Sequence, residues 1–256
     1  MQGLKQWIPS SMKRHIRRWQ QYTVDMVKGD WKKMAVDHGE LEPSYLVKSI
    51  EQKLKASVPG SGKVHNIKLA IDRINRIIIE PGQIFSFWKT VGDPSTKNGF
   101  LKSRSIMGDR LQEEVGGGLC QVSGLIYFLA LHGGMNILER HPHSLDIYTE
   151  EERFTPLGSD ATVVFGYKDL RFMNPYDFRV SLNFLITETV LTGELIASNQ
   201  LEPFMIKFNY TPFPGHTDVT ALSIKDGVSR EISTNRYKKM PQQAWVSRMN
   251  CIFATL

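Results

Sequence analysis

A glycine-rich segment ends at a cysteine in a position that favours nucleophilic chemistry. Gly116, Gly117 and Gly118 stand just before Leu119 and Cys120, and apolar residues at helical spacing follow. Glycine adopts backbone conformations closed to other residues and lets a ligand approach the main chain. The free amides and the dipole at a helix start favour the thiolate form of a cysteine. The same amides can stabilise the oxyanion of an acyl-transfer reaction.

A structural role for Cys120 is the competing interpretation. A free cysteine is often a small buried residue, and the glycines would then form only a turn. The chain has two cysteines, Cys120 and Cys251, so a disulfide framework is excluded. Cys251 has no neighbouring glycine or histidine and is interpreted as structural. The sequence leaves both roles of Cys120 open.

Two histidines separated by one proline form a second cluster. His141 and His143 point to the same side if their segment is extended, because side chains alternate there. Either one is a candidate general base for Cys120. The second interpretation is a surface loop, and the third is a zinc site that includes Cys120. Asp160 is a candidate for the group that orients a catalytic histidine.

An aspartate and an arginine two residues apart form a third cluster. Asp169 and Arg171 point to the same side if that segment is extended. The planar fork of an arginine can hold a substrate carboxylate. An aspartate–arginine pair that pins a turn is an equally weighted interpretation. We therefore treat both residues as candidates for substrate binding.

The elements that must position these groups follow from hydrophobic periodicity. Helical spacing predicts a short helix over residues 44–55, a helix over residues 67–78 and the helix that begins near Cys120. Residues 103–107 and 110–115 flank a Gly-Asp pair and predict a hairpin. Alternating residues predict strands through the C-terminal part.

This order of elements predicts an α+β fold. We expect N-terminal helices, and a central cysteine-bearing helix packed on a mainly antiparallel β-sheet or sandwich. The predicted division is an N-terminal helical arm over residues 1–62 and an α+β domain over residues 63–256.

The arm begins with a basic amphipathic pattern. Apolar residues recur three or four positions apart, with lysines and arginines between them: Ile8, Met12, Ile16, Trp19 and Met26, and Lys13, Arg14, Arg17, Arg18 and Lys28. The periodicity favours an arm packed on the main domain. The alternative is peripheral contact with an anionic membrane surface.

The composition of the 256-residue chain is that of a globular protein, with 41% hydrophobic and 23% charged residues. The net charge of +6 is mild, and we expect no nucleic-acid partner. No apolar run approaches the roughly 20 residues of a membrane-spanning helix, and no signal-peptide pattern is found. The sequence therefore predicts a cytoplasmic protein, and we expect no metal or other cofactor.

Four segments, taken in order, resemble the VanW family, whose name comes from an accessory protein of vancomycin-resistance clusters. They lie within residues 81–186 and read PGQIFSFWKTVGDPSTKNGF, GGGLCQVSGLIYFLALHGG, ERHPHS and PLGSDATVVFGYKDLRFMNP. The arm and the strands after this core carry no motif to which a chemistry is assigned.

The resemblance implies L,D-transpeptidase-like activity on peptidoglycan, with Cys120 as the nucleophile. The cysteine would attack a stem-peptide carbonyl, form a thioester and pass the acyl group to an amine. By side-chain chemistry, His143 or His141 would carry the proton, and the amides of residues 117–120 would hold the oxyanion. The glycines, with Gln121 and Ser123 on the helix, would contact the peptidoglycan peptide or its precursor.

Two residues depart from the family pattern. Gly124 and Phe128 stand where the resemblance implies threonine and asparagine, so contacts with the substrate are expected to differ. The competing function is a non-catalytic accessory or binding protein for cell-wall precursors, linked to glycopeptide resistance. The lack of an export signal and the altered helix favour this alternative.

Overall fold

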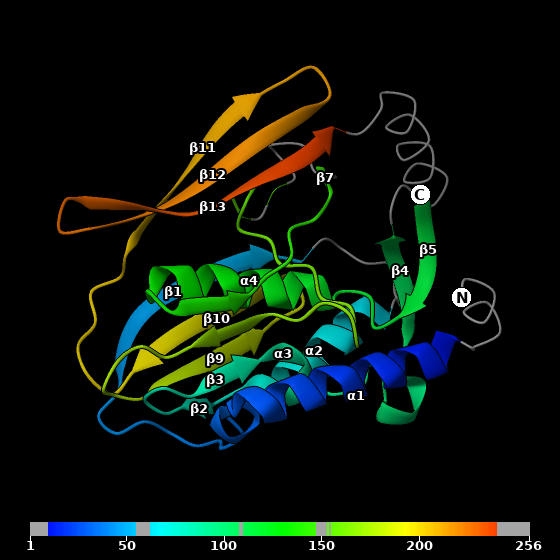
Figure 1. The fold of residues 1–256 in the computed structure, drawn as a ribbon, viewed down its shortest axis with the longest axis horizontal. Coiled ribbons are helices and arrows are strands. Elements are labelled where there is room, and N and C mark those ends of the chain that lie inside the picture. The colour runs from blue at the N-terminus through cyan, green and yellow to red at the C-terminus, as the bar shows by residue number, and fades with distance from the viewer. Residues whose placement is uncertain (1–9, 55–61, 108–109, 147–152, 154, 240–256) are drawn as a thin grey trace.

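The computed structural model describes residues 10–54, 62–107, 110–146, 153 and 155–239, which form four α-helices and several small sheets. The α-helices are α1 (Ser10–Lys28), α2 (Gly62–Ile74), α3 (Phe87–Val91) and α4 (Leu119–His132). Two 3-10 helices, η2 (Asp30–Lys33) and η3 (Thr96–Asn98), follow α1 and α3. In Figure 1, α4 crosses the centre of the molecule and α1 runs along its lower edge.

The central sheet is antiparallel and has the order β1-β10-β9-β2. Its strands are β1 (Tyr45–Lys53), β2 (Ile77–Ile79), β9 (Val180–Ile186) and β10 (Val190–Ala197). Val180 and Leu182 are buried on β9, as are Leu191 and Leu195 on β10. Because successive side chains of a strand point to opposite faces, these residues lie on the face of the sheet that packs in the core.

A second sheet, in the order β11-β12-β13-β7, joins the C-terminal strands to the middle of the chain. It consists of β7 (Leu145–Asp146), β11 (Met205–Pro212), β12 (His216–Lys225) and β13 (Val228–Lys239). Strand β7 pairs with β13 in parallel, while the other pairs are antiparallel. This pairing brings the segment that follows the two histidines next to the C-terminal strand.

Two smaller sheets complete the described part of the fold. The first has the order β3-β8-β6 and consists of β3 (Ile84–Ser86), β6 (Asn136–Glu139) and β8 (Arg171–Met173). The second is the hairpin of β4 (Lys102–Met107) and β5 (Arg110–Val115).

Helix α4 is buried on almost every side. Its core residues include Leu125, Ile126 and Leu129, none of which is exposed. A Cβ on Gly193 of β10 would lie only 2.9 Å from a Leu125 methyl carbon, so this glycine lets the helix approach the sheet closely. Phe128 contacts Phe208 of β11 from the other side, at 6.1 Å between ring centres. A helix that is apolar on all sides lies in the core of a protein. Contacts on all sides of α4 therefore hold its first turn in place.

The predicted α+β fold with a central cysteine-bearing helix and mainly antiparallel sheets is confirmed. The predicted hairpin is also confirmed for the described residues 102–107 and 110–115. The helix predicted over residues 44–55 is wrong, because Tyr45–Lys53 is strand β1 and pairs along its length with β10. That strand belongs to the central sheet, although the predicted division of the chain includes it in the N-terminal arm.

The helix predicted over residues 67–78 ends early. Arg76 has a positive φ of 61°, and its amide donates to the carbonyl of Leu182 on β9. This turn redirects the chain, so the isoleucines that follow form β2 instead of a last helical turn. The buried face of α2 proper, with Ile67 and Ile71, is as the spacing predicts.

Helix α1 contacts the domain, but not through the apolar side by which amphipathic helices usually pack. The side chain of Asp25 is mostly buried and forms an ion pair with Arg171 of β8 at 2.9 Å, while Trp19 and Val27 are 69% and 89% exposed. Helix α1 therefore contacts the domain through polar side chains, and its apolar residues face outward. Within the part of the chain that the structure describes, none of the helices is long and apolar enough to cross a membrane.

Candidate functional site

Cys120 is the second residue of α4, directly after the glycine turn. Gly118 caps the helix with a φ of +100°, and a Cβ there would lie 3.0 Å from Cγ of Lys63 and 3.1 Å from Cγ1 of Ile67. The turn therefore requires glycine for its conformation and for its close contact with α2. Buried Asn66 of α2 fixes the turn by donating to the carbonyl of Gly117 at 3.1 Å.

The first amides of α4 are partly engaged. The Leu119 amide donates to the carbonyl of Gly116 at 3.4 Å, and the Gln121 amide donates to the carbonyl of Gly118 at 3.0 Å. Both bonds lie within the turn itself. Of the amides of residues 117–120 predicted for the oxyanion, the Leu119 amide is thus committed to the turn. The Cys120 amide remains a candidate donor to the oxyanion at the start of the helix.

Asp160 receives two hydrogen bonds from His143. The main-chain amide of His143 donates to Oδ2 at 2.6 Å, and Nδ1 of its ring is 2.8 Å from the same oxygen. The backbone bond fixes the loop, and the ring bond fixes the orientation of the imidazole. The predicted orienting role of Asp160 therefore has a geometric counterpart at His143.

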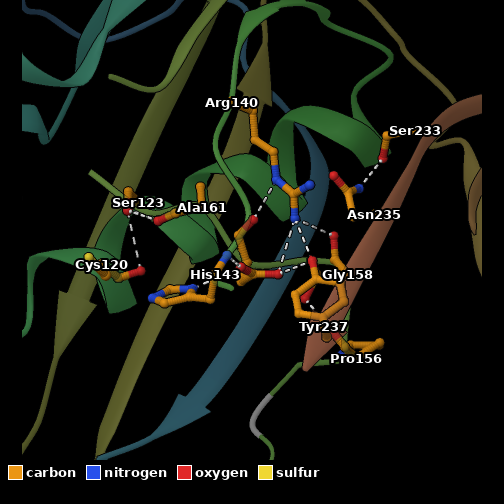
Figure 2. Close-up of polar contacts among 12 residues, drawn as sticks. Cys120, Ser123, Arg140, His143, Pro156, Gly158, Ala161, Ser233, Asn235 and Tyr237 are labelled. Atoms are coloured by element: carbon orange, nitrogen blue, oxygen red, sulfur yellow. Dashed lines mark hydrogen bonds and ion pairs between the residues drawn. The ribbon is translucent and has the colours of Figure 1, made fainter. Parts of the chain in front are cut away.

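Two further side chains hold the Asp160 carboxylate from the opposite side. The hydroxyl of Tyr237 donates to Oδ1 at 2.6 Å, and Nη2 of Arg140 lies 3.1 Å from the same oxygen. Arg140 also donates to the main-chain carbonyls of Asp160 and Gly158, and its side chain is only 6% exposed. Figure 2 shows Arg140 and Tyr237 close together, with His143 between them and Cys120.

The electrostatics of the cluster favour an ionised Asp160 and a protonated His143. Burial alone raises the pKa of the Asp160 carboxyl, but His143 and Arg140 outweigh it and hold that pKa well below 3.8. Burial lowers the pKa of His143, yet its hydrogen bonds with Asp160 and Cys120 raise that pKa from 6.5 to about 10. Burial raises the pKa of Tyr237 well above 10.0, so its hydroxyl stays a donor.

His143 is paired with the carboxylate and lies beside Cys120, with which it lines one cavity (Figure 2). Both Asp160 and Cys120 favour the charged form of the imidazole and so raise its pKa. The Cys120 thiol is half-buried and lies 3.8 Å from the carbonyl of Val163. The order cysteine, imidazole and carboxylate is the arrangement of a nucleophile, a proton carrier and an orienting group.

His141 faces away from the sulfur. Its Nε2 is 3.0 Å from Oε1 of Glu139, an oxygen that also accepts the amide of Asp169. The zinc interpretation would require this ring to converge with Cys120 and His143. Among the described residues, no group of three or more histidine, cysteine, aspartate or glutamate side chains could hold a metal ion.

Asp169 and Arg171 lie apart from the cysteine. Asp169 accepts hydrogen bonds from Ser86 and from the amide of Trp88, and burial raises its pKa from 3.8 to about 6. It lines a second cavity, next to α1, and Arg171 pairs with Asp25 of that helix. The structure does not bring these two candidates for substrate binding to Cys120.

The other candidates on α4 have different surroundings. Ser123 is fully buried, and its hydroxyl donates to the carbonyl of Ala161 at 2.7 Å, which ties the helix to the segment after Asp160. Gln121, in contrast, lines a cavity next to Cys120 and His143. Gly124 lines the same cavity, so the departure from threonine there widens it on the helix side.

This cavity has a volume of about 120 Å³ and lies at the start of α4. Pockets for whole drug-sized ligands measure roughly 300–1,000 Å³, so one end of a larger substrate fits here. Two glutamine atoms on its lining are buried without a hydrogen-bond partner in the described chain, Nε2 of Gln121 and Oε1 of Gln52. Buried polar atoms normally have partners, so these two atoms are candidates for hydrogen bonds with a substrate.

Sequence reasoning missed several residues of this site. Arg140 and Tyr237 anchor Asp160, Gln52 lines the cavity, and Asn66 holds the glycine turn. Arg140 stands beside the two histidines in the sequence. An arginine among candidate catalytic residues could have been proposed as the partner of a carboxylate. Tyr237 has no such signal, because it lies 77 residues beyond Asp160.

The fold and the site together define an α+β protein with a cysteine–histidine–aspartate cluster at the start of a core helix. The family model described as VanW like protein matches residues 62–196, more than half of the chain. The chain belongs to the VanW family. The match includes Cys120, His143 and Asp160 and leaves out Tyr237.

Two relatives illustrate the similarity. The chain is 30% identical over 138 residues to the Vancomycin B-type resistance protein VanW of Enterococcus faecalis, which covers 54% of this chain and 50% of that protein. It is 35% identical over 113 residues to the Uncharacterized protein YoaR of Bacillus subtilis, which covers 44% of this chain and 36% of that protein. The chain thus spans half or less of the length of these relatives. No solved structure matches it.

Proposed function

We propose that this chain is a cysteine acyltransferase that acts on peptidoglycan stem peptides or their precursors, in the manner of an L,D-transpeptidase. The observation that carries the proposal is the position of one imidazole, that of His143, which is 2.8 Å from Asp160 and lines the same cavity as Cys120. A lone buried cysteine would have no need of an oriented imidazole. The class of substrate rests on family membership and on the name of the Enterococcus faecalis relative, which ties that protein to vancomycin resistance.

The reaction has two half-reactions. The sulfur of Cys120, as a thiolate, attacks the carbonyl carbon of the donor amide, and a C–S bond forms as the C–N bond breaks. His143, protonated in this environment, gives its proton to the departing amine. An acceptor amine then attacks the thioester, His143 takes the proton back, and the thiolate of Cys120 is regenerated.

The cavity supplies groups that suit a peptide substrate. Nε2 of Gln121 is an unpartnered donor on a residue that lines the same cavity as Cys120, and together with the Cys120 amide it can stabilise the oxyanion. Oε1 of Gln52 is an unpartnered acceptor that can receive a substrate N–H. One buried donor and one buried acceptor match the two polar groups of a peptide unit.

The test is intact-protein mass spectrometry after incubation with stem peptides. The wild-type chain should gain the mass of the acyl fragment, and the site should map to Cys120. Cys120→Ala should show no adduct, and His143→Ala should acylate roughly 10²–10⁴-fold more slowly. His141→Ala is the matched control, because that ring lies in the same loop and faces Glu139.

The outcome separates catalysis from binding. Adduct formation that persists in Cys120→Ala would overturn the proposal. Binding of stem peptides without any adduct in the wild-type chain would instead support the accessory or binding role. An equal effect of His141→Ala and His143→Ala would contradict the assignment of the proton carrier.

A further inference from the structure

Helix α1 is held on the domain by its polar side. Nη1 of Arg171 lies 2.9 Å from Oδ1 of Asp25, and Gln21 donates to the same oxygen at 3.0 Å. The guanidinium of Arg17 lies 5.9 Å from the centre of the Tyr167 ring. The ion pair is almost fully buried, with 13% of the Asp25 side chain exposed. These contacts define which side of the helix faces the protein.

The opposite side of α1 carries an apolar stripe that faces solvent. Asp25 and Ile16 are nine residues apart, which at about 3.6 residues a turn puts them on opposite sides. Ile16, Trp19 and Val27 share that outer side and are 42%, 69% and 89% exposed. Met26 lies beside them and is also exposed. Amphipathic helices normally bury this stripe, so it is available for a partner.

The charge of this region is strongly basic. Helix α1 contains one acidic residue and five basic ones, followed by two more lysines in η2: Asp25, and Lys13, Arg14, Arg17, Arg18, Lys28, Lys32 and Lys33. Asp25 is already neutralised by Arg171. A second copy of this helix would therefore meet like charge, whereas an anionic surface would meet opposite charge.

We propose that α1 docks the protein on an anionic phospholipid surface, with its apolar stripe inserted at the headgroup level. An apolar stripe with tryptophan, beside lysines and arginines, is the pattern of interfacial helices. Trp19, which is 69% exposed, supplies an amphipathic ring that favours this depth. The polar side keeps the domain attached through Asp25 and Arg171. This inference is independent of the chemistry at Cys120.

The test is sedimentation of the full chain with vesicles of phosphatidylglycerol or of phosphatidylcholine. The chain should pellet with the anionic vesicles only, and added salt should weaken the binding. Trp19→Ser and Val27→Ser should each lower the partition coefficient roughly tenfold, since each removes a large apolar group from the interface. Lys28→Glu should lower it as well.

The control is Val228→Ser, which replaces another exposed valine, 56% exposed, at the start of β13. It should bind vesicles like the wild-type chain. Equal binding to both lipids, or no pelleting at all, would overturn the proposal. So would self-association in light scattering that Trp19→Ser abolishes while vesicles have no effect, because the stripe would then bind a second copy. Circular dichroism of each variant checks that the fold is kept.

Discussion

His143 donates to one oxygen of Asp160 twice, through its main-chain amide at 2.6 Å and through Nδ1 of its ring at 2.8 Å. The other oxygen of Asp160 is held by Tyr237 and Arg140. With the carboxylate fixed on both sides, the imidazole is held in one orientation, in the cavity that Cys120 also lines. The predictions below follow from this arrangement.

The acylation half-reaction should lose rate at high pH. It requires a protonated His143, whose pKa is raised to about 10. The rate should therefore fall as the pH rises through about 10. Asp160→Asn removes a contact that favours the charged imidazole, so the alkaline limb should move to lower pH. The measurement is the rate of adduct formation against pH, and an alkaline limb that is the same in both proteins would contradict the prediction.

Gln121 should act on the reaction rate and not on the fold. Gln121→Leu removes the unpartnered Nε2 donor of the cavity that Cys120 lines, and loss of one oxyanion donor lowers kcat by roughly 10²–10³. Stability should stay the same or rise slightly, because a buried unpartnered group is removed. The comparison variant is Gln52→Leu, which should raise KM more than it lowers kcat. A normal kcat in Gln121→Leu would exclude the oxyanion role.

Asp160 should make the fold sensitive to acid. Its pKa in the folded protein lies below the ordinary value of 3.8, so the unfolded chain binds the proton more tightly. The stabilisation is therefore present above pH 3.8 and is lost as the pH falls below it. Denaturant unfolding at a series of pH values should show a steeper acid loss for the wild-type chain than for Asp160→Asn. Parallel curves would contradict this account.

Gly118 should be required for both the fold and the position of Cys120. Gly118→Ala forces a Cβ into contact with Lys63 and Ile67 at a φ of +100°, and we expect a loss of about 1–3 kcal/mol in unfolding free energy. Gly82→Ala is the control, because Gly82 also has a positive φ but open space around it. Only Gly118→Ala should slow acylation. Equal losses in the two variants would show that the contact with α2 is unimportant.

Local sequence patterns predicted much of the fold. They failed where pairing between distant segments determines the secondary structure. The buried face of α2 and the hairpin of β4 and β5 are set by neighbours in the sequence and were predicted. Strand β1 was predicted as a helix, because its partner β10 lies more than 100 residues away and is invisible to a local pattern. The same limit applies to α1, whose orientation depends on an ion pair with Arg171 of β8.

The sequence suffices to propose the members of the candidate site but not their arrangement. Residue types and order suffice to propose Cys120, a histidine and Asp160. Strict alternation puts His141 and His143 on one side, whereas the structure turns them to Glu139 and Asp160 respectively. Tyr237 could not be found, because only the parallel pairing of β7 with β13 brings its strand to this loop.

The most direct test of the central claim is NMR titration of the imidazole of His143, assigned by its loss in His143→Ala among the seven histidines of the chain. We predict that this ring titrates with a pKa of about 10. That pKa should fall both in Asp160→Asn and in Cys120→Ala, because each variant removes one of its two partners. A titration near the ordinary value of 6.5 that Cys120→Ala leaves unchanged would contradict the proposed pairing of the sulfur and the imidazole.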